Sequence, residues 1–179
     1  MEKTSKIRLT IYHANQCDPK RCTGLKLKRL GFARIVTKTR FMPKRAIILN
    51  PFGEIAFSPQ DRTRVADFGL AALDCSWEHA EKVLLHQVKG TSRCLPVLVA
   101  GNPTNFAKAT KLSTAEALAG ALYIAGFKDE AKELLSVFTW GHTFFELNAD
   151  LLEEYAAAKD SAEIVSIMQR KLTRNVGSE

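Results

Sequence analysis

Short apolar segments that alternate with helix-like segments over the first hundred residues constrain the fold of this chain most strongly. These segments are rich in β-branched and aliphatic residues, and each has the length of a buried strand. They cover residues 7–12, 33–37, 46–49, 70–73 and 95–100. Strands that alternate with helices form a parallel sheet covered on both faces. The sequence therefore predicts an α/β fold, a parallel sheet with flanking helices.

Helix signals lie between these strands and dominate the second half of the chain. Three residues mark helix ends in the first half of the chain. Gly31 follows the end of a helix, Pro59 is a first-turn proline and Ser76 is an N-cap. Ser113 and Glu116 form a capping box sequence. The helices are expected at residues 23–30, 59–68, 77–87, 113–125, 128–138, 143–159 and 161–172. We therefore expect an N-terminal α/β domain at 1–94 and a mainly helical domain, all-helical from Ser113, at 95–179.

Positive charge is concentrated at the start of the chain. Residues 1–45 hold thirteen Lys and Arg against Glu2 and Asp18, a net charge of +11 in a chain whose total is +7. Such a segment can neutralise phosphates, which is the sequence-independent part of nucleic-acid affinity. The candidate RNA-binding residues are Lys20, Arg21, Lys26, Lys28 and Arg29. The alternative is a solvated basic face without a ligand.

The N-terminal residues and the cysteines bear on location and metals. The start of the chain does not have the pattern of a signal peptide, and no apolar run is long enough to span a bilayer, so a cytoplasmic protein without membrane partners is expected. Cys17 and Cys22 are widely spaced for a zinc knuckle, and Cys75 and Cys94 do not form a second close pair. No metal site is therefore expected.

The loops after two predicted strands carry the candidate ligand-binding residues. Thr23 and Thr114 each fall in the first turn of a predicted helix, where free N–H groups and the helix dipole favour a carboxylate. Either can also be an ordinary first-turn threonine. Asp74 can be a base, a ligand group or a helix cap, and Trp77 can be a cofactor platform or a core residue.

Four segments in order resemble the small-subunit rRNA aminocarboxypropyltransferases of archaea and eukaryotes, a family of ribosome biogenesis enzymes. They are residues 17–24 (CDPKRCTG), 73–77 (LDCSW), 95–103 (LPVLVAGNP) and 111–117 (KLSTAEA). The resemblance implies transfer of the 3-amino-3-carboxypropyl group of S-adenosylmethionine to N3 of a pseudouridine that usually carries an N1-methyl group. It also implies a SPOUT-like, knotted fold, contrary to the usual rule against threaded chains.

The resemblance also implies roles for individual residues. Thr23 and Thr114 would lie near the carboxylate of the cofactor, Leu73 would hold the ribose through its carbonyl, and Leu95 would address the adenine through its backbone. Apolar walls and the rest of the cofactor crevice would come from Leu49, Pro51, Asp74 and Trp77. Thr110 stands at a tyrosine position that contacts the cofactor, and residues 105–107 read Asn-Phe-Ala where the family has Asn-Tyr-Gly.

The mechanism implied is a displacement at the carbon attached to the sulfonium, which releases 5′-methylthioadenosine. Asp74 is the first candidate for the base that removes the N3 proton, and Asp18 is the second. A SPOUT-type RNA methyltransferase and a non-catalytic rRNA-binding assembly factor are the alternatives. The partner would be small-subunit rRNA or a pre-ribosomal particle, and we expect the protein to be a monomer.

Overall fold

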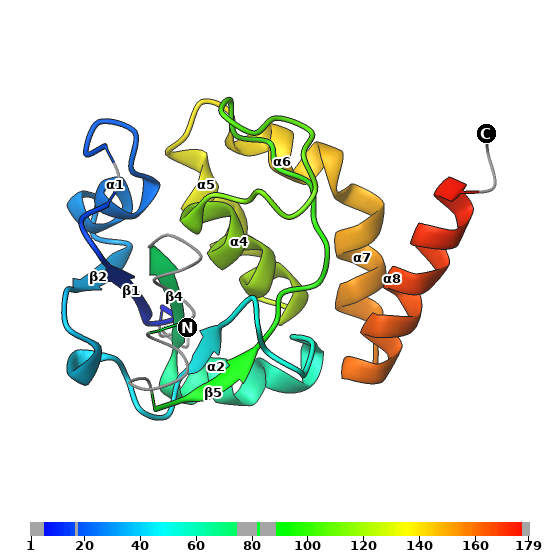
Figure 1. The fold of residues 1–179 in the computed structure, drawn as a ribbon, viewed down its shortest axis with the longest axis horizontal. Coiled ribbons are helices and arrows are strands. Elements are labelled where there is room, and N and C mark those ends of the chain that lie inside the picture. Colours follow the sequence, from blue (N-terminus) through cyan, green and yellow to red (C-terminus); the bar gives the residue numbers. More distant parts are fainter. Residues whose placement is uncertain (1–5, 17, 75–81, 83–88, 177–179) are drawn as a thin grey trace, which may run out of the picture.

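Five parallel strands form the centre of the structure (Figure 1). The computed structural model describes residues 6–16, 18–74, 82 and 89–176. The strands are β1 (Leu9–His13), β2 (Ala33–Val36), β3 (Ile47–Leu49), β4 (Leu70–Asp74) and β5 (Thr91–Arg93). Their order in the sheet is β2-β1-β4-β3-β5, and every pairing between them is parallel. The predicted α/β class with a parallel sheet is confirmed.

The fifth predicted strand is wrong. Residues 95–100 do not form a strand, and the edge strand β5 precedes them. Pro96 has no N–H to give to a ladder. Side chains of the C-terminal helices take the place of a neighbouring strand, because Asn148 bonds both backbone groups of Val99 and the Tyr155 hydroxyl donates to the Val97 carbonyl. Burial raises the pKa of the Tyr155 hydroxyl to about 12, which keeps it a neutral donor.

The helices largely match their predicted positions. Their bounds are α1 (Thr23–Arg29), α2 (Arg62–Phe68) after the 3₁₀ turn η2 (Pro59–Asp61), α4 (Thr114–Ile124), α5 (Lys128–Ser136), α6 (Gly141–Leu147), α7 (Ala149–Ala157) and α8 (Ser161–Val176), with a further 3₁₀ turn η1 (Thr39–Phe41). The Ser113 side chain accepts the Glu116 N–H, and the Glu116 carboxylate accepts the Ser113 N–H, as a capping box requires. Apart from Lys82, which is helical, the helix predicted at 77–87 lies outside the described residues.

The single helix predicted at 143–159 is wrong, because the chain breaks at Asn148 into α6 and α7. Asn148 has φ −112° and ψ 12°, which departs from helical geometry. Its side chain is 1% exposed and is fully engaged with the backbone of Val99 and Phe144. The apolar spacing of the two helices continues across the break, so periodicity alone does not show it.

One hydrophobic core joins the sheet to the C-terminal helices. Ile11 and Leu70 on the sheet, Leu27 on α1, and Leu118 and Leu122 on α4 belong to the same buried cluster. In Figure 1, α4 lies between the sheet and the pair α7 and α8. A smaller cluster of Tyr12, Val36, Met42, Ile48 and Ala71 covers the opposite face of the sheet. No helix among the described residues is both long and apolar enough to cross a membrane.

The loop between residues 100 and 113 contains two residues in the left-handed region. Ala107 and Thr110 both have φ 60°, which is unfavourable for residues with a Cβ and more so for a β-branched one. We expect Ala107→Gly to stabilise the protein by about 1 kcal/mol and to raise Tm by roughly 2–4 °C in thermal denaturation.

Ala109→Gly in the same loop is the matched control. Ala109 is exposed, lies at an isolated bridge with Val99 and does not have a positive φ, so glycine there is expected to lower Tm slightly. Equal shifts in the two variants would show that the conformation of Ala107 is not strained.

Candidate active site

A cavity of about 740 Å³ opens at the carboxyl ends of β3, β4 and β5, where ligands bind in open α/β sheets. Loops after the strands, the segment 94–98 and the loop 102–114 supply its walls, and Val165 and Met168 of α8 contribute as well. Its volume lies within the range of roughly 300–1,000 Å³ that suits cofactor-sized ligands.

Two helix N-termini meet at this cavity. Thr23 is the first residue of α1 and Thr114 is the first residue of α4, and both line the cavity. The hydroxyl oxygen of Thr23 accepts the backbone N–H of Ala115 at 3.3 Å, so it satisfies one of the free donors of α4. The two positions are 91 residues apart in the sequence and adjacent in the fold.

A buried carboxylate organises the loop beside these helices. Glu116 is 0% exposed, and its two oxygens accept four hydrogen bonds of 2.7–2.9 Å. The donors are the backbone N–H groups of Gly101, Asn102 and Ser113, and the side-chain amide of Asn102. Asn102 and Ser113 line the cavity, whereas Glu116 does not. Glu116 therefore stabilises one wall of the cavity through its hydrogen bonds to these two residues.

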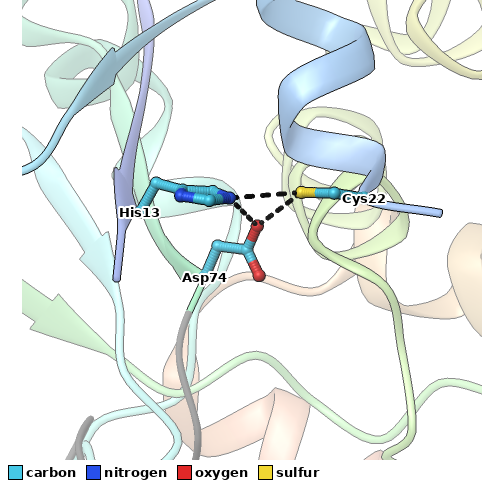
Figure 2. A group of neighbouring side chains, drawn as sticks. All are labelled: His13, Cys22 and Asp74. Atoms are coloured by element: carbon cyan, nitrogen blue, oxygen red, sulfur yellow. Dashed lines mark hydrogen bonds and ion pairs between the residues drawn. The ribbon is translucent and has the colours of Figure 1, made fainter. Parts of the chain in front are cut away.

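A cluster of three side chains, His13, Cys22 and Asp74, lies at the carboxyl ends of β1 and β4 (Figure 2). The Cys22 thiol donates to Asp74 Oδ2 at 3.1 Å, and Cys22 Sγ lies 3.4 Å from His13 Nε2. His13 Nε2 also lies 3.7 Å from Asp74 Oδ2. His13 ends β1, Asp74 ends β4, and the two are register partners in the sheet. The possible ligand atoms of His13, Cys22 and Asp74 all lie within 4.8 Å of one another, which is close enough to hold a metal ion.

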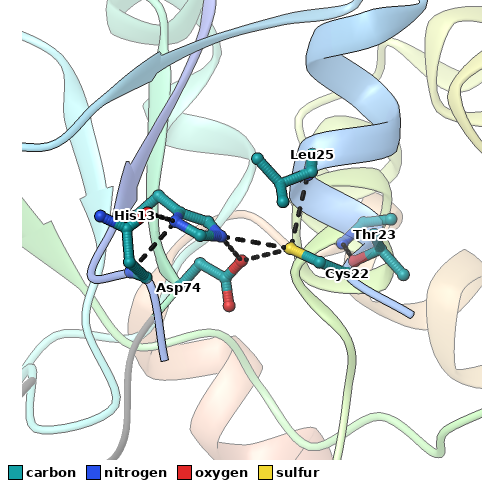
Figure 3. Close-up of polar contacts among 7 residues, drawn as sticks. His13, Cys22, Thr23, Leu25 and Asp74 are labelled. Atoms are coloured by element: carbon teal, nitrogen blue, oxygen red, sulfur yellow. Dashed lines mark hydrogen bonds and ion pairs between the residues drawn. The ribbon is translucent and has the colours of Figure 1, made fainter. Parts of the chain in front are cut away.

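The start of α1 completes this cluster (Figure 3). Cys22 is the N-cap of the helix, and its sulfur accepts the backbone N–H of Leu25 at 3.5 Å. Gly24 leaves room for the carboxylate, since a Cβ there would lie 3.1 Å from Asp74 Oδ2. Helix α1 thus approaches the end of β4 closely enough for a side-chain contact over 52 positions of sequence.

The structure brings most of the predicted cofactor residues to one cavity. The residues that line it are Thr23, Leu49, Pro51, Leu73, Asp74, Leu95, Thr110 and Thr114. Trp77 lies outside the described residues. Asp18 does not line the cavity, and its carboxylate instead accepts the Lys20 backbone N–H at 3.0 Å in an exposed turn. Burial raises the pKa of the Cys94 thiol, another cavity residue, so this thiol stays protonated.

A basic groove adjoins the cavity. Four of the five predicted RNA-binding residues line this groove, together with Phe138 and Trp140: they are Lys20, Arg21, Lys26 and Arg29. Lys26 also donates to the Val137 carbonyl at 2.7 Å and lies over the Phe138 ring. Lys28 is exposed on α1 outside the groove lining. The groove and the cavity are adjacent, because four residues line both of them: Arg21, Cys22, Thr23 and Trp140.

Comparison with known proteins agrees with this architecture. A profile of the family described as "Ribosome biogenesis protein, C-terminal" matches residues 47–172. The 16S rRNA aminocarboxypropyltransferase of Methanosarcina mazei is 48% identical over 167 residues, which cover 92% of this chain and 95% of that protein. The enzyme of the same description from Methanocaldococcus jannaschii is 49% identical over 162 residues, 90% of this chain and 94% of that one. The chain belongs to the 16S rRNA aminocarboxypropyltransferase family.

A solved structure extends this likeness to three dimensions. It is described as the SAM-dependent rRNA:acp-transferase Tsr3 from Vulcanisaeta distributa, and it is 39% identical in sequence. The TM-score is 0.82, and the match covers 95% of this chain and all of that one. The α/β arrangement around the cavity is therefore an arrangement of the aminocarboxypropyltransferase family.

A second profile, "Possible Fer4-like domain in RNase L inhibitor, RLI", matches residues 7–40. An iron–sulfur cluster of the ferredoxin type takes four cysteine ligands. The matched segment contains only Cys17 and Cys22, so its residues do not fit such a cluster.

Sequence reasoning missed His13 and Cys22 as site residues in this aminocarboxypropyltransferase. Neither position carries a local signal for a site, because the contact to Asp74 exists only once β1 pairs with β4. The signal that could have found them is positional. His13 and Asp74 end parallel strands and Cys22 precedes a helix, and all such positions lie at one edge of the sheet.

Proposed function

We propose that this chain transfers the 3-amino-3-carboxypropyl group of S-adenosylmethionine to N3 of a pseudouridine, usually N1-methylated, in small-subunit rRNA. The observation that carries the proposal is a cofactor-sized cavity at the carboxyl ends of the strands that shares part of its wall with a basic groove. The cavity suits the cofactor, and the groove suits an RNA backbone. Family membership supplies the reaction class.

The lining of the cavity supports an orientation for the cofactor. The carboxylate of S-adenosylmethionine would lie at the N-terminus of α4, near Thr114 and Thr23, where the helix dipole favours negative charge. Leu73 and Leu95 would hold the ribose and the adenine through their backbones. Apolar contact to the rings would come from Leu49, Pro51 and Trp77, and Thr110 would lie at the rim.

The reaction is a displacement. N3 of the pyrimidine attacks the γ-carbon of the aminocarboxypropyl group, a new N–C bond forms, and the C–S bond breaks with its electron pair going to sulfur. Neutral 5′-methylthioadenosine leaves, and the N3 proton passes to a base and then to water. Three carbons are attached to the same sulfonium, so selection of one depends on how the cofactor is oriented, which is catalysis by positioning.

We propose Asp74 as the base. It lies at the cavity, whereas Asp18 lies in an exposed turn outside the lining. A carboxylate within reach of the N3 proton can act as a general base. Asp74 also contacts Cys22, which lines both the cavity and the groove, and this is where the two substrates would meet.

We propose that neither cofactor binding nor transfer requires a metal. Helix N-termini and apolar walls are sufficient for an organic cofactor of this size. The donor atoms of His13, Cys22 and Asp74 could hold an ion, so the proposal needs a direct test. Calorimetric titration of the protein with S-adenosylmethionine in excess chelator should give the same affinity as without chelator. Binding that vanishes with chelator and returns with zinc would contradict it.

The function is tested by identifying the by-product. The protein is incubated with S-adenosylmethionine and small-subunit rRNA, and the nucleoside released is identified by mass spectrometry. We expect 5′-methylthioadenosine together with modified rRNA. Release of S-adenosylhomocysteine would indicate a SPOUT-type methyltransferase instead. RNA binding without consumption of the cofactor would indicate an assembly factor that does not catalyse.

RNA affinity is expected to fall steeply with salt. Each phosphate contact releases counterions, and removal of one contact should reduce the slope of log K against log salt by roughly 0.7. The variants are glutamine substitutions at Lys20, Arg21, Lys26, Lys28 and Arg29. Lys159→Gln, at an exposed lysine after α7, is the control and should leave the slope unchanged. Unchanged slopes in the five variants would place the RNA on another surface.

Further features of the proposal concern the fold, the partner and the location. The family resemblance implies a SPOUT-like trefoil knot in the chain and small-subunit rRNA or a pre-ribosomal particle as the partner. We also propose that the protein acts as a monomer in the cytoplasm. Light scattering of the purified protein should give the mass of one chain, about 20 kDa. A mass of twice that value would contradict the monomer.

A further inference from the structure

Both ring nitrogens of His13 contact polar atoms. The backbone N–H of Asn15 donates to His13 Nδ1 at 3.1 Å. Asn15 Oδ1 lies 3.0 Å from the same nitrogen, so the side chain and the backbone of Asn15 both contact Nδ1. On the other side of the ring, Nε2 lies 3.4 Å from Cys22 Sγ and 3.7 Å from Asp74 Oδ2. The imidazole is therefore held between Asn15 and the pair Cys22 and Asp74.

The thiol of Cys22 lies between the imidazole and the carboxylate. It donates to Asp74 Oδ2 at 3.1 Å, because a carboxylate oxygen can only accept. Both His13 and Cys22 are buried, at 3% and 7% exposure, so water competes weakly for these contacts.

We propose that His13 and Cys22 are positioning residues for Asp74, which fix the orientation of its carboxylate at the cavity through their contacts with Oδ2. In Figure 2 both contacts reach the same oxygen, Oδ2, and the second oxygen points away from the pair. Gly24 has no side chain, which lets α1 approach Oδ2 closely, since a Cβ there would lie 3.1 Å from this oxygen. This inference rests on the proposed role of Asp74 as the base.

The choice of cysteine as the N-cap of α1 agrees with this role. Serine, threonine, aspartate and asparagine are the common N-caps, and a sulfur at 3.5 Å from the Leu25 N–H is a weak one. Serine at this position would keep a cap and a donor to Asp74, whereas alanine would remove both. Cys22→Ser and Cys22→Ala therefore form a matched pair.

The first test measures single-turnover transfer at saturating cofactor and RNA. We expect Cys22→Ala to slow transfer on the order of 10-fold, as for loss of a hydrogen bond to a charged group, and Cys22→Ser to stay within a few-fold of wild type. His13→Leu should behave like Cys22→Ala, and His13→Gln, which keeps a side-chain donor, should retain more of the rate.

A double-mutant cycle separates positioning from a purely structural role. If Cys22 acts through Asp74, Cys22→Ala should change the rate very little when Asp74 is already Asn. Loss of the helix cap is common to both backgrounds and cancels. The same 10-fold loss in the Asp74→Asn background would overturn the proposal, and so would equal rates for Cys22→Ser and Cys22→Ala.

A second readout does not depend on transfer, so it keeps the inference separate from the proposed function. A carboxylate beside a thiol disfavours the thiolate, so Asp74→Asn should speed alkylation of Cys22 by iodoacetamide several-fold, measured by peptide mass spectrometry. Cys94 in the same molecules is the reference and should react at an unchanged rate. An unchanged rate at Cys22 would refute the contact, whereas absence of transfer by wild type together with faster alkylation would refute only the function.

Discussion

The Asp74→Asn variant is expected to transfer the aminocarboxypropyl group on the order of 10²-fold more slowly than the wild-type protein while binding S-adenosylmethionine with nearly unchanged affinity. The amide keeps the shape of the side chain but cannot take the N3 proton. Raising the pH should restore part of the rate, because more of the pyrimidine then loses its proton to water. Single-turnover transfer and calorimetric titration on the same preparation measure the two quantities.

The outcome distinguishes a base from a structural residue. If Asp74 instead orders the loop after β4, cofactor affinity should fall first and the rate should recover at saturating cofactor. Asp67→Asn is the matched control, since Asp67 is exposed on α2 outside the cavity lining. Near-normal values of both rate and affinity in Asp74→Asn would remove Asp74 from the mechanism.

Glu116→Ala is expected to cause the largest loss of stability. Its carboxylate is fully buried and accepts four hydrogen bonds, so truncation leaves four donors without their partner. The cost should be about 3 kcal/mol or more, with a fall in Tm of roughly 6–12 °C. Because the loop it holds lines the cavity, affinity for S-adenosylmethionine should also fall, by about 10-fold or more.

Two further variants test whether the lost hydrogen bonds of Glu116 cause the falls in Tm and in cofactor affinity. Glu116→Gln keeps the volume but replaces one acceptor oxygen with a donor, so it should lie between alanine and wild type in both measurements. Glu146→Ala removes an exposed carboxylate from α6 and should leave Tm and cofactor affinity near wild type. Wild-type cofactor affinity in Glu116→Ala at a temperature where it is folded would show that the loop keeps its shape without this residue.

Local sequence signals predicted the elements that local physics determines. The strands at β1 to β4 are short apolar runs, and the start of α4 is a capping box, Ser113 with Glu116, whose partners lie three residues apart. The end of α1 is marked by Gly31, which has φ 78°. Each of these signals depends on groups within a few residues of each other, so the fold does not need to be known.

The errors came from interactions between distant segments. The apolar run at 95–100 has the composition of a strand, but its backbone bonds to Asn148 and Tyr155 of the C-terminal helices. The same side chain of Asn148 divides the helix predicted at 143–159. The long-range contact between Asn148 and Val99 thus accounts for two wrong predictions, and neither residue carries a local sign of this contact.

By itself the sequence determined the α/β class, the strands that carry the site and, through resemblance, the residues that line one cavity. Only the tertiary structure placed His13 beside Asp74 and Cys22, because parallel pairing of β1 with β4 brings together the ends of strands about sixty residues apart. It also joined the N-termini of α1 and α4 through Thr23. The periodicity of apolar residues shows which side chains of a helix or strand share a face. Strand order and helix packing decide which residues from distant segments meet at that face.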